Sequence, residues 1–306
     1  MKRAGIFLCV SFFIAGFAAA QSSQIKYAVI PEDPRPGEPV TVAVEGPARQ
    51  ALLLRGERQF ARAAFFNVPP QDGTPGFMAA ILTVPSTASP GPALIKLENE
   101  DGLLCEIPLV ITGREFVSEV IPLNPVLTGI RTDPDPQKTA EADRLWVILT
   151  RTGNEIYHTG KFTPPVISTR RTSFFGDRRV FQYSNGRSDT SIHAGVDYGV
   201  PTGTRVTACG SGKVVLARNR IVTGNSVILE HAPGVYSLYY HLDKIEAQED
   251  SLVNRGDLLG LSGSTGLSTG PHLHWEIRVS TENTDPDAFV IRPIIDKDLI
   301  ISKIFN

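Results

Sequence analysis

Histidine is the residue type in this chain best suited to chemistry, and five of its six histidines lie between positions 193 and 274. Three groups, His193-x-x-x-Asp197, His241 and His272-Leu-His274, combine imidazole nitrogens with a carboxylate. Zinc binds both kinds of atom, and a catalytic zinc site normally has three protein ligands and leaves the fourth position to water. Two histidines and one aspartate would satisfy that count, so these residues predict a catalytic zinc site.

The spacing of His272 and His274 supports a common site. In a β-strand, residues two positions apart point to the same face, so these imidazoles would project side by side while Leu273 faces the other way. His158 and His231 stand beside turn-like sequence. We therefore interpret these two as structural histidines.

The candidate residues stand within a series of short motifs between about residues 185 and 287. In chain order these are His193-Ala-Gly-Val-Asp197-Tyr198, Gly203-Thr204-x-Val206, Gly210-x-Gly212-x-Val214, Tyr240-His241-Leu242, Gly256-Asp257-x-x-Gly260 and Gly263-Ser-Thr-Gly266-x-x-x-Gly270-Pro271-His272-Leu273-His274-Trp275. Each motif alone is weak. Their order and spacing resemble the lysostaphin-type, or LytM-type, zinc metallopeptidases that act on bacterial cell walls.

The resemblance implies a role for each of the five residues. In that family, zinc is bound by the His and Asp of the first motif and by the second histidine of His-x-His. The resemblance therefore implies that His193, Asp197 and His274 bind one Zn(II) per chain. The other two histidines of the pattern are catalytic, which assigns that role to His241 and His272. The resemblance also implies a LytM-type antiparallel β-sheet domain (a duplicated hybrid motif) and an endopeptidase that hydrolyses peptide bonds of peptidoglycan.

The residue types explain how such a hydrolysis would proceed. Zinc lowers the pKa of a bound water and polarises the scissile carbonyl, so the site further needs proton transfer and charge stabilisation. One of His241 and His272 would take the proton from water and deliver it to the leaving amine, while the other donates to the developing oxyanion. The sequence leaves open which histidine does which, and which peptidoglycan bond is cut.

Two other function classes match parts of the sequence. A non-catalytic LytM-like regulator of other peptidoglycan hydrolases would have lost metal ligands, whereas this chain keeps all five residues. A lipoyl or biotinyl carrier would share the pattern of residues 253–260. Such a carrier needs a lysine at a tight turn, and no lysine of this chain lies in that position. The glycine-rich run 263–270 lacks the Gly-Lys-Ser/Thr ending of a phosphate-binding loop, so we interpret it as a wall of a substrate groove.

The elements that must position these residues are predicted to be mainly β. Residues 21–112 contain short β-type runs separated by Pro and Gly turns, which predict a small immunoglobulin-like β-sandwich. Residues 176–290 consist of strands punctuated by glycine, typical of a partly closed antiparallel sheet with almost no helix.

Residues 113–175 are predicted to connect the two domains through one helix. Asp135-Pro136 can start this helix, apolar residues follow at helical spacing, and Gly153-Asn154 would end it. Residues 291–306 are expected to form a C-terminal tail. Because residues 21–175 carry no chemical motif, we expect them to position or partly cover the site.

The first 20 residues have the pattern of a signal peptide. Lys2 and Arg3 precede an apolar stretch that ends near Phe17, and three alanines at 18–20 offer a cleavage site. The stretch is shorter than the ~20 residues of a spanning helix, which favours cleavage over a lasting membrane anchor. We therefore expect an exported protein of the periplasm or cell envelope, or an extracellular one, without stable membrane insertion.

Composition limits the partners of the chain. Its formal charge is −2 and it has no long basic run, so we expect no nucleic acid as a partner. The resemblance to LytM-type peptidases implies peptidoglycan peptides as partners. Cys105 and Cys209 lie in strand-like sequence of different predicted domains, so we expect buried thiols and no bridge. The sequence gives no indication of the oligomeric state.

Overall fold

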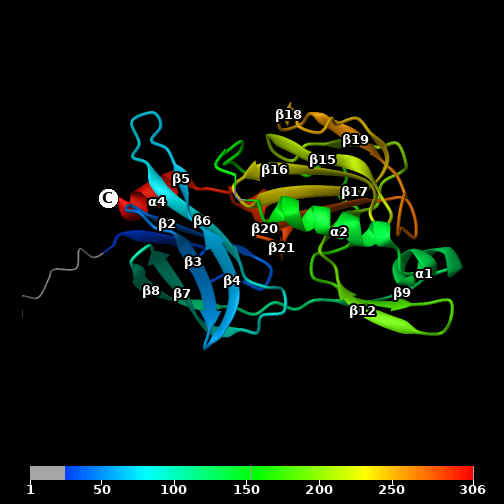
Figure 1. The fold of residues 1–306 in the computed structure, drawn as a ribbon, viewed down its shortest axis with the longest axis horizontal. Helices are drawn as coiled ribbons and strands as arrows, with labels where there is room; N and C mark the ends of the chain where they lie inside the picture. Colours follow the sequence, from blue (N-terminus) through cyan, green and yellow to red (C-terminus); the bar gives the residue numbers. More distant parts are fainter. Residues whose placement is uncertain (1–24, 152, 306) are drawn as a thin grey trace, which may run out of the picture.

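A computed structural model describes residues 25–151 and 153–305 of the chain, and its amino-terminal part is a sandwich of two four-stranded antiparallel sheets (Figure 1). Across the first sheet the strands are β1 (Tyr27–Ile30), β2 (Pro39–Val44), β6 (Phe77–Thr83) and β5 (Phe66–Val68). Across the second they are β4 (Arg58–Ala64), β3 (Gln50–Arg55), β7 (Gly91–Asn99) and β8 (Gly102–Ile111). Alternating side chains fill the space between the sheets, where Val42, Leu53 and Ile95 are fully buried.

The second large unit is a ten-stranded sheet that carries the candidate site residues. Its main path runs β10 (Arg171–Ser173), β13 (Gly195–Tyr198), β20 (Leu273–Val279), β17 (Val235–Ile245), β16 (Gly224–Ala232), β15 (Gly212–Arg220) and β18 (Leu252–Val253). Beside this path, β19 (Leu258–Ser262) pairs with β17 and with β14 (Arg205–Thr207), and β21 (Glu282–Thr284) pairs with β20. Every residue of β17 from Val235 to Leu242 is buried, because apolar clusters cover both faces of the sheet.

The predicted mainly β fold with antiparallel sheets is confirmed, but the prediction of a single connector helix is wrong. Helix α2 (Pro136–Leu149) begins at the predicted position, where the Asp135 carboxylate accepts from the backbone N–H of Gln137 at 2.7 Å. An additional helix, α1 (Pro125–Thr132), begins in the same way at Asn124-Pro125. Helix α2 ends at Leu149, before the predicted Gly153-Asn154 stop, and packs across the large sheet (Figure 1).

The connector also contributes a strand to a small third sheet, which we call the cap sheet. Strand β9 (Ser118–Pro122) pairs in parallel with β11 (Arg178–Gln182), and β11 pairs antiparallel with β12 (Ser188–Ile192). Thus the connector is part of the structure around β12, the strand that leads directly to His193. This pairing joins segments that are 60 positions apart, so no local pattern predicts it.

The C-terminal segment predicted to be a tail is largely helical, which corrects that prediction. Helix α3 (Pro286–Ile291) is followed by α4 (Lys297–Ile304), which lies against the amino-terminal sandwich (Figure 1). Lys303 on α4 pairs with Glu32 at 2.7 Å, and Ile300 and Ile304 are buried in a core that the sandwich shares with the large sheet. The chain therefore returns to its own amino-terminal unit.

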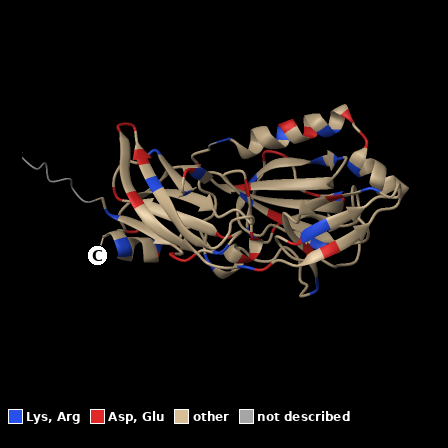
Figure 2. Ribbon diagram, turned by 90° about the horizontal axis from the view of Figure 1, so that it is seen from below, with Lys and Arg blue, Asp and Glu red and all other residues tan. Residues whose placement is uncertain are grey.

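Several properties of the described part of the chain bear on its partners. No helix between residues 25 and 305 is long and apolar enough to cross a membrane. Acidic and basic residues are interspersed over both large units rather than separated by sign (Figure 2). Cys105 and Cys209 are free, and Cys209 is fully buried. The predicted signal peptide lies outside the described residues.

Gly195 allows β13 and β20 to approach closely and so provides a test of the fold. A Cβ added at this position would lie 2.2 Å from the carbonyl oxygen of Trp275 and 2.9 Å from Cα of Glu276. We predict that Gly195→Ala lowers the free energy of unfolding by about 1–3 kcal/mol, because β13 must move away from β20. The measurement is urea unfolding followed by circular dichroism.

Gly46→Ala is the matched control, because an added Cβ there meets nothing within 4 Å. It should change the free energy of unfolding by less than about 0.5 kcal/mol. Equal stability of the two variants would show that the close approach of β13 and β20 is not a constraint on the fold.

Candidate functional site

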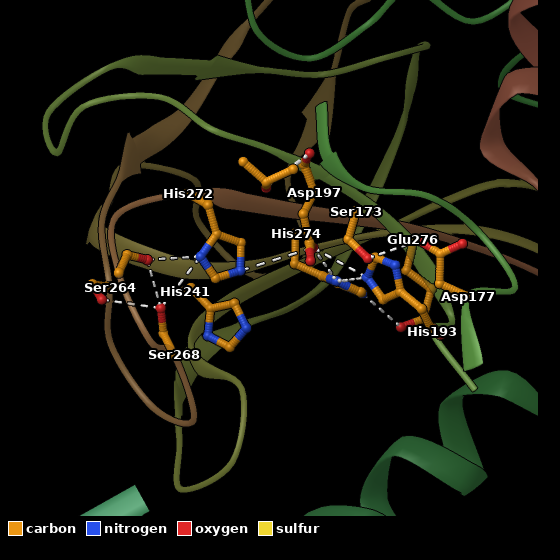
Figure 3. Close-up of polar contacts among 12 residues, drawn as sticks. Ser173, Asp177, His193, Asp197, His241, Ser264, Ser268, His272, His274 and Glu276 are labelled. Carbon is orange, nitrogen blue, oxygen red and sulfur yellow. Dashed lines mark hydrogen bonds and ion pairs between the residues drawn. The ribbon is translucent and has the colours of Figure 1, made fainter. Parts of the chain in front are cut away.

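Three adjacent strands of the large sheet bring the five predicted residues together (Figure 3). In the β13–β20 pair Asp197 stands opposite His274, and in the β20–β17 pair His274 stands opposite Tyr240, the neighbour of His241. His193 precedes β13, and His272 precedes β20, where it bridges to Gly263. All five residues line one cavity.

The three predicted metal ligands form a compact set of donor atoms. Nε2 of His193 lies 3.1 Å from Oδ1 of Asp197 and 3.0 Å from Nδ1 of His274, and the last two atoms are 2.8 Å apart. All three residues are buried. A tetrahedral zinc ion with bonds of about 2.0–2.1 Å separates its ligand atoms by roughly 3.3 Å, so this set fits a metal ion with only small outward movements.

Each of these ligand side chains is fixed by a further hydrogen bond on its other polar atom. Nδ1 of His193 lies 2.8 Å from the carbonyl oxygen of Phe174, which can only accept, so the proton is on Nδ1 and Nε2 is free to bind a metal. Nε2 of His274 lies 3.4 Å from Oε2 of Glu276, which leaves Nδ1 as the donor atom. The second oxygen of Asp197 accepts from Arg179 at 2.6 Å.

The pairing partners set the charges of the buried acids. Burial alone would raise the pKa of Asp197, but His193 and His274 outweigh it and hold that pKa well below its ordinary value. Burial would also raise the pKa of Glu276, yet Arg278 and His274 lower it to about 2. Both carboxylates are therefore ionised at neutral pH.

The two histidines predicted to bind the metal differ in their proton affinity. Burial lowers the pKa of His193, so it is neutral and ready to bind a metal. Burial also acts to lower the pKa of His274, but hydrogen bonds to Asp197 and Glu276 outweigh it and raise the pKa to about 9. In the metal-free protein His274 therefore carries a proton at neutral pH.

His241 and His272, the two predicted catalytic residues, have the same tautomer. Nδ1 of His241 donates to the carbonyl of Thr265 at 2.7 Å, and Nδ1 of His272 donates to that of Gly270 at 2.8 Å. Both Nε2 lone pairs are thus available. Nε2 of His272 lies 3.8 Å from Oδ1 of Asp197, and the rings of His241 and His272 are 4.8 Å apart.

The backbone at His241 is strained. Its φ of 61° lies in the left-handed region, which is uncommon for a residue other than glycine and tends to occur at functional sites. Burial, and then repulsion from His272 and His274, lower the pKa of His241 to about 3. His241 is thus held as a neutral imidazole.

A close approach of Gly224 and Gly266 positions the loop whose Thr265 carbonyl accepts the hydrogen bond from His241. At Gly266, where φ is +76°, an added Cβ would lie 2.4 Å from the backbone nitrogen of Gly224. Between them, Oγ1 of Thr265 donates to the carbonyl of Leu242 at 2.7 Å and accepts from the backbone N–H of Asn225 at 3.0 Å. Leu267, Ser268 and Thr269 of the glycine-rich run line the cavity.

The cavity has a volume of about 250 Å³ and lies between the large sheet, the cap sheet and residues 267–269. Leu267 packs with Leu123 and Phe181, so the glycine-rich loop and the cap region meet beside the site. The connector supplies part of the lining, namely Ile121, Leu123 and Arg131. The connector thus lies at the cavity, and a covering role for residues 21–175 as a whole stays a prediction.

Sequence reasoning missed Glu276 and Arg179, which hydrogen-bond to the predicted ligands His274 and Asp197. Glu276 follows His274 by two positions on one strand face, so the β-alternation that linked His272 to His274 could have found it. Arg179 gave no comparable signal. His158 and His231 lie apart from this lining: His231 is fully buried and bonds Oγ of Ser237 at 2.7 Å.

Comparison with known proteins agrees with this geometry. Residues 191–286 match the model of Peptidase family M23. This part of the chain is similar to peptidase family M23. The match contains all five site residues and confirms the resemblance drawn from the motifs. In contrast, β9 and β11 of the cap sheet lie outside it.

The curated relatives that this chain matches are longer proteins. The peptidoglycan DD-endopeptidase ShyA of Vibrio cholerae serotype O1 is 32% identical over 171 residues, which are 56% of this chain and 39% of ShyA. The DD-carboxypeptidase/endopeptidase Mpg of Neisseria meningitidis serogroup B is 37% identical over 135 residues, 44% of this chain and 30% of Mpg. The chain thus matches well under half of the length of either relative.

A solved structure shares the fold of most of this chain. A peptidase M23 protein from Pseudomonas aeruginosa superposes with a TM-score of 0.59 and 24% identity, over 84% of this chain and 94% of that one. The likeness extends well beyond residues 191–286. It shows a common fold for the larger assembly of domains.

The protonated His274 leads to a prediction about pH. A metal ion that takes Nδ1 must displace the proton, so the apparent zinc affinity should rise about tenfold per pH unit between pH 7 and 8.5 and level off above pH 9. Competition with a chromophoric chelator, corrected for its own protonation, measures this. An affinity independent of pH in that range would contradict the proposed charge state.

Proposed function

We propose that the chain is a zinc-dependent metalloendopeptidase that hydrolyses peptide bonds in peptidoglycan. The observation that carries the proposal is the arrangement of donors in one cavity. His193, Asp197 and His274 present three converging ligand atoms, while His241 and His272 direct free Nε2 atoms to the same space. A group of residues that only stabilised the fold would not need His241 and His272 beside it with free Nε2 lone pairs.

The bound metal would supply Lewis-acid polarisation of the scissile carbonyl and lower the pKa of the attacking water. The chain's own residues do the rest. A free Nε2 on His241 or His272 accepts the proton of the water and then returns it to the leaving amine nitrogen. The Thr265 and Gly270 carbonyls hold the two rings so that these nitrogens stay directed at the substrate. Burial of His241 strengthens its electrostatic interactions with the reacting groups.

The peptidoglycan substrate is inferred from the names of the relatives and the dimensions of the cavity. ShyA is a peptidoglycan DD-endopeptidase, and its match to this chain extends over 171 residues. A cavity of about 250 Å³ suits a narrow peptide with small side chains. The alternative function, a regulator without catalysis, would not need these five residues around one cavity.

The place of action follows from the substrate and the sequence. Peptidoglycan lies outside the cytoplasmic membrane, and residues 1–20 have the pattern of a cleaved signal peptide. We propose an exported protein of the periplasm or cell envelope whose mature form begins near Gln21. Amino-terminal sequencing of protein from the envelope fraction measures this directly.

Replacement of single histidines tests the proposed roles. His274→Ala removes one of three protein ligands, so zinc should be lost on dialysis against a weak chelator, and activity with it. His272→Ala and His241→Ala keep all three ligands, so zinc should stay near one per chain while turnover falls about 10²–10⁴-fold. Elemental analysis and digestion of purified sacculi are done on the same samples, with the new amino termini identified by mass spectrometry.

The matched control is His158→Ala, a histidine that stacks on Phe162 away from the cavity lining. It should keep both zinc and activity. Retention of zinc by His274→Ala with its loss from His272→Ala would reverse the assignment of these two residues. A wild-type chain that holds zinc but cleaves no sacculus bond would favour the regulator instead.

A further inference from the structure

Arg179 joins the candidate metal centre to the cap sheet. Its Nη2 donates to Oδ2 of Asp197 at 2.6 Å, and its Nε donates to Oε1 of Glu119 at 2.6 Å. Arg179 lies on β11 and Glu119 on the neighbouring strand β9. A carboxylate from the connector and a carboxylate of the metal site therefore share one guanidinium group.

The groups around this contact are constrained and largely removed from water. The side chain of Arg179 is 16% exposed and that of Asp197 is 8% exposed. Glu119 also accepts from the hydroxyl of Ser173 at 3.0 Å, and that hydroxyl lies 3.1 Å from a carboxylate oxygen of Asp177. A guanidinium group has a rigid planar set of donors, so two such contacts fix its orientation.

We propose that Arg179 is a positioning residue of the metal centre and that Glu119 holds it in place. The proposal rests on the proposed function of the same site. With Oδ2 of Asp197 held by Arg179, only Oδ1 faces His193 and His274. Asp197 would then offer a metal ion Oδ1 alone, because its second oxygen is occupied by Arg179.

Electrostatics alone would give the opposite expectation. A guanidinium group next to a metal ligand repels the cation, so its removal would strengthen zinc binding if charge were all that mattered. Partners of metal ligands nevertheless contribute by orientation, and their loss typically costs 10–100-fold in affinity or activity. Because Arg179 holds one oxygen of Asp197 and leaves the other directed at His193 and His274, we expect the orienting effect of Arg179 to exceed its repulsion of the metal ion.

A second reading of Arg179 is a wall residue that binds a carboxylate of the substrate, since it also lines the cavity. The two roles differ in their measurable consequences. A residue that orients Asp197 affects zinc affinity and kcat. A residue that only binds substrate affects KM and leaves zinc affinity unchanged. Nε of Arg179 is occupied by Glu119 and Nη2 by Asp197, and these two contacts favour the orienting role.

The test is the zinc dissociation constant of the full mature chain, measured by competition with a chromophoric chelator. Arg179→Met should weaken zinc binding about 10–100-fold. Arg179→Lys, which keeps the charge but not the paired donors, should recover only part of this loss. The kcat of the zinc-saturated Arg179→Met variant should fall while its KM stays within about twofold, since substrate contacts are unchanged.

Arg178→Met is the matched control on the same strand. Arg178 donates to the carbonyl oxygens of Gly176 and Ser86 and lies over the ring of Phe116, so its loss tests a purely structural effect. Its zinc affinity should equal that of the wild type even if its melting temperature falls. An equal loss of zinc affinity in Arg178→Met and Arg179→Met would overturn the proposal.

A double-mutant cycle tests the role of Glu119. Glu119→Gln alone should weaken zinc binding, but by less than Arg179→Met, and this keeps the test possible if the arginine variant does not fold. In the Arg179→Met background the same change should have no further effect, because Glu119 acts only through Arg179. If the two substitutions weakened zinc binding additively, Glu119 would not act through Arg179, and this part of the proposal would be wrong.

The outcomes separate the positioning role from the proposed function. Unchanged or tighter zinc binding in Arg179→Met overturns only the positioning role, provided that the wild type binds one zinc and digests sacculi. A wild-type chain that binds no zinc overturns both. Unchanged zinc affinity with a raised KM would assign Arg179 to substrate binding instead.

Discussion

The pairing of β13 with β20 is the constraint on which the site depends. Its register sets Asp197 opposite His274, and Oδ1 of Asp197 lies 2.8 Å from Nδ1 of His274 and 3.1 Å from Nε2 of His193. A shift of one residue would move Asp197 to the other face of the sheet. The absence of a side chain at Gly195 permits the close approach. The converging donors are thus a consequence of sheet geometry.

Buried charged side chains need partners, and each charged group of the site is paired with another. Around Asp197 stand two histidines and Arg179, and behind His274 stand Glu276 and Arg278, whose side chains are paired. A buried polar group without a partner would cost ~1–3 kcal/mol, and more for a charge. The hydrogen bonds also select the histidine tautomers. The same contacts therefore pair the buried polar groups and leave the nitrogens that would bind a metal free.

The sequence predicted the part of the site that local spacing encodes. The two-residue alternation of His272 and His274 is a property of any strand, and the order of the glycine motifs identified the family. Contacts between distant segments were not predictable. Arg179 and Glu119 are 60 positions apart, and their meeting depends on the parallel β9–β11 pair, which has no local signature. Helix α1 was missed although Asn124-Pro125 repeats the start signal of α2. The domain boundaries remain predictions.

The central claim is that His193, Asp197 and His274 hold one metal ion while His241 and His272 stay free. Anomalous diffraction at the zinc edge from crystals of the zinc-loaded chain tests this claim most directly. The account predicts one anomalous peak about 2.0–2.2 Å from Nε2 of His193, Nδ1 of His274 and Oδ1 of Asp197. A peak bonded to His241 or His272 in place of one of these ligands, or no peak in the cavity, would contradict it.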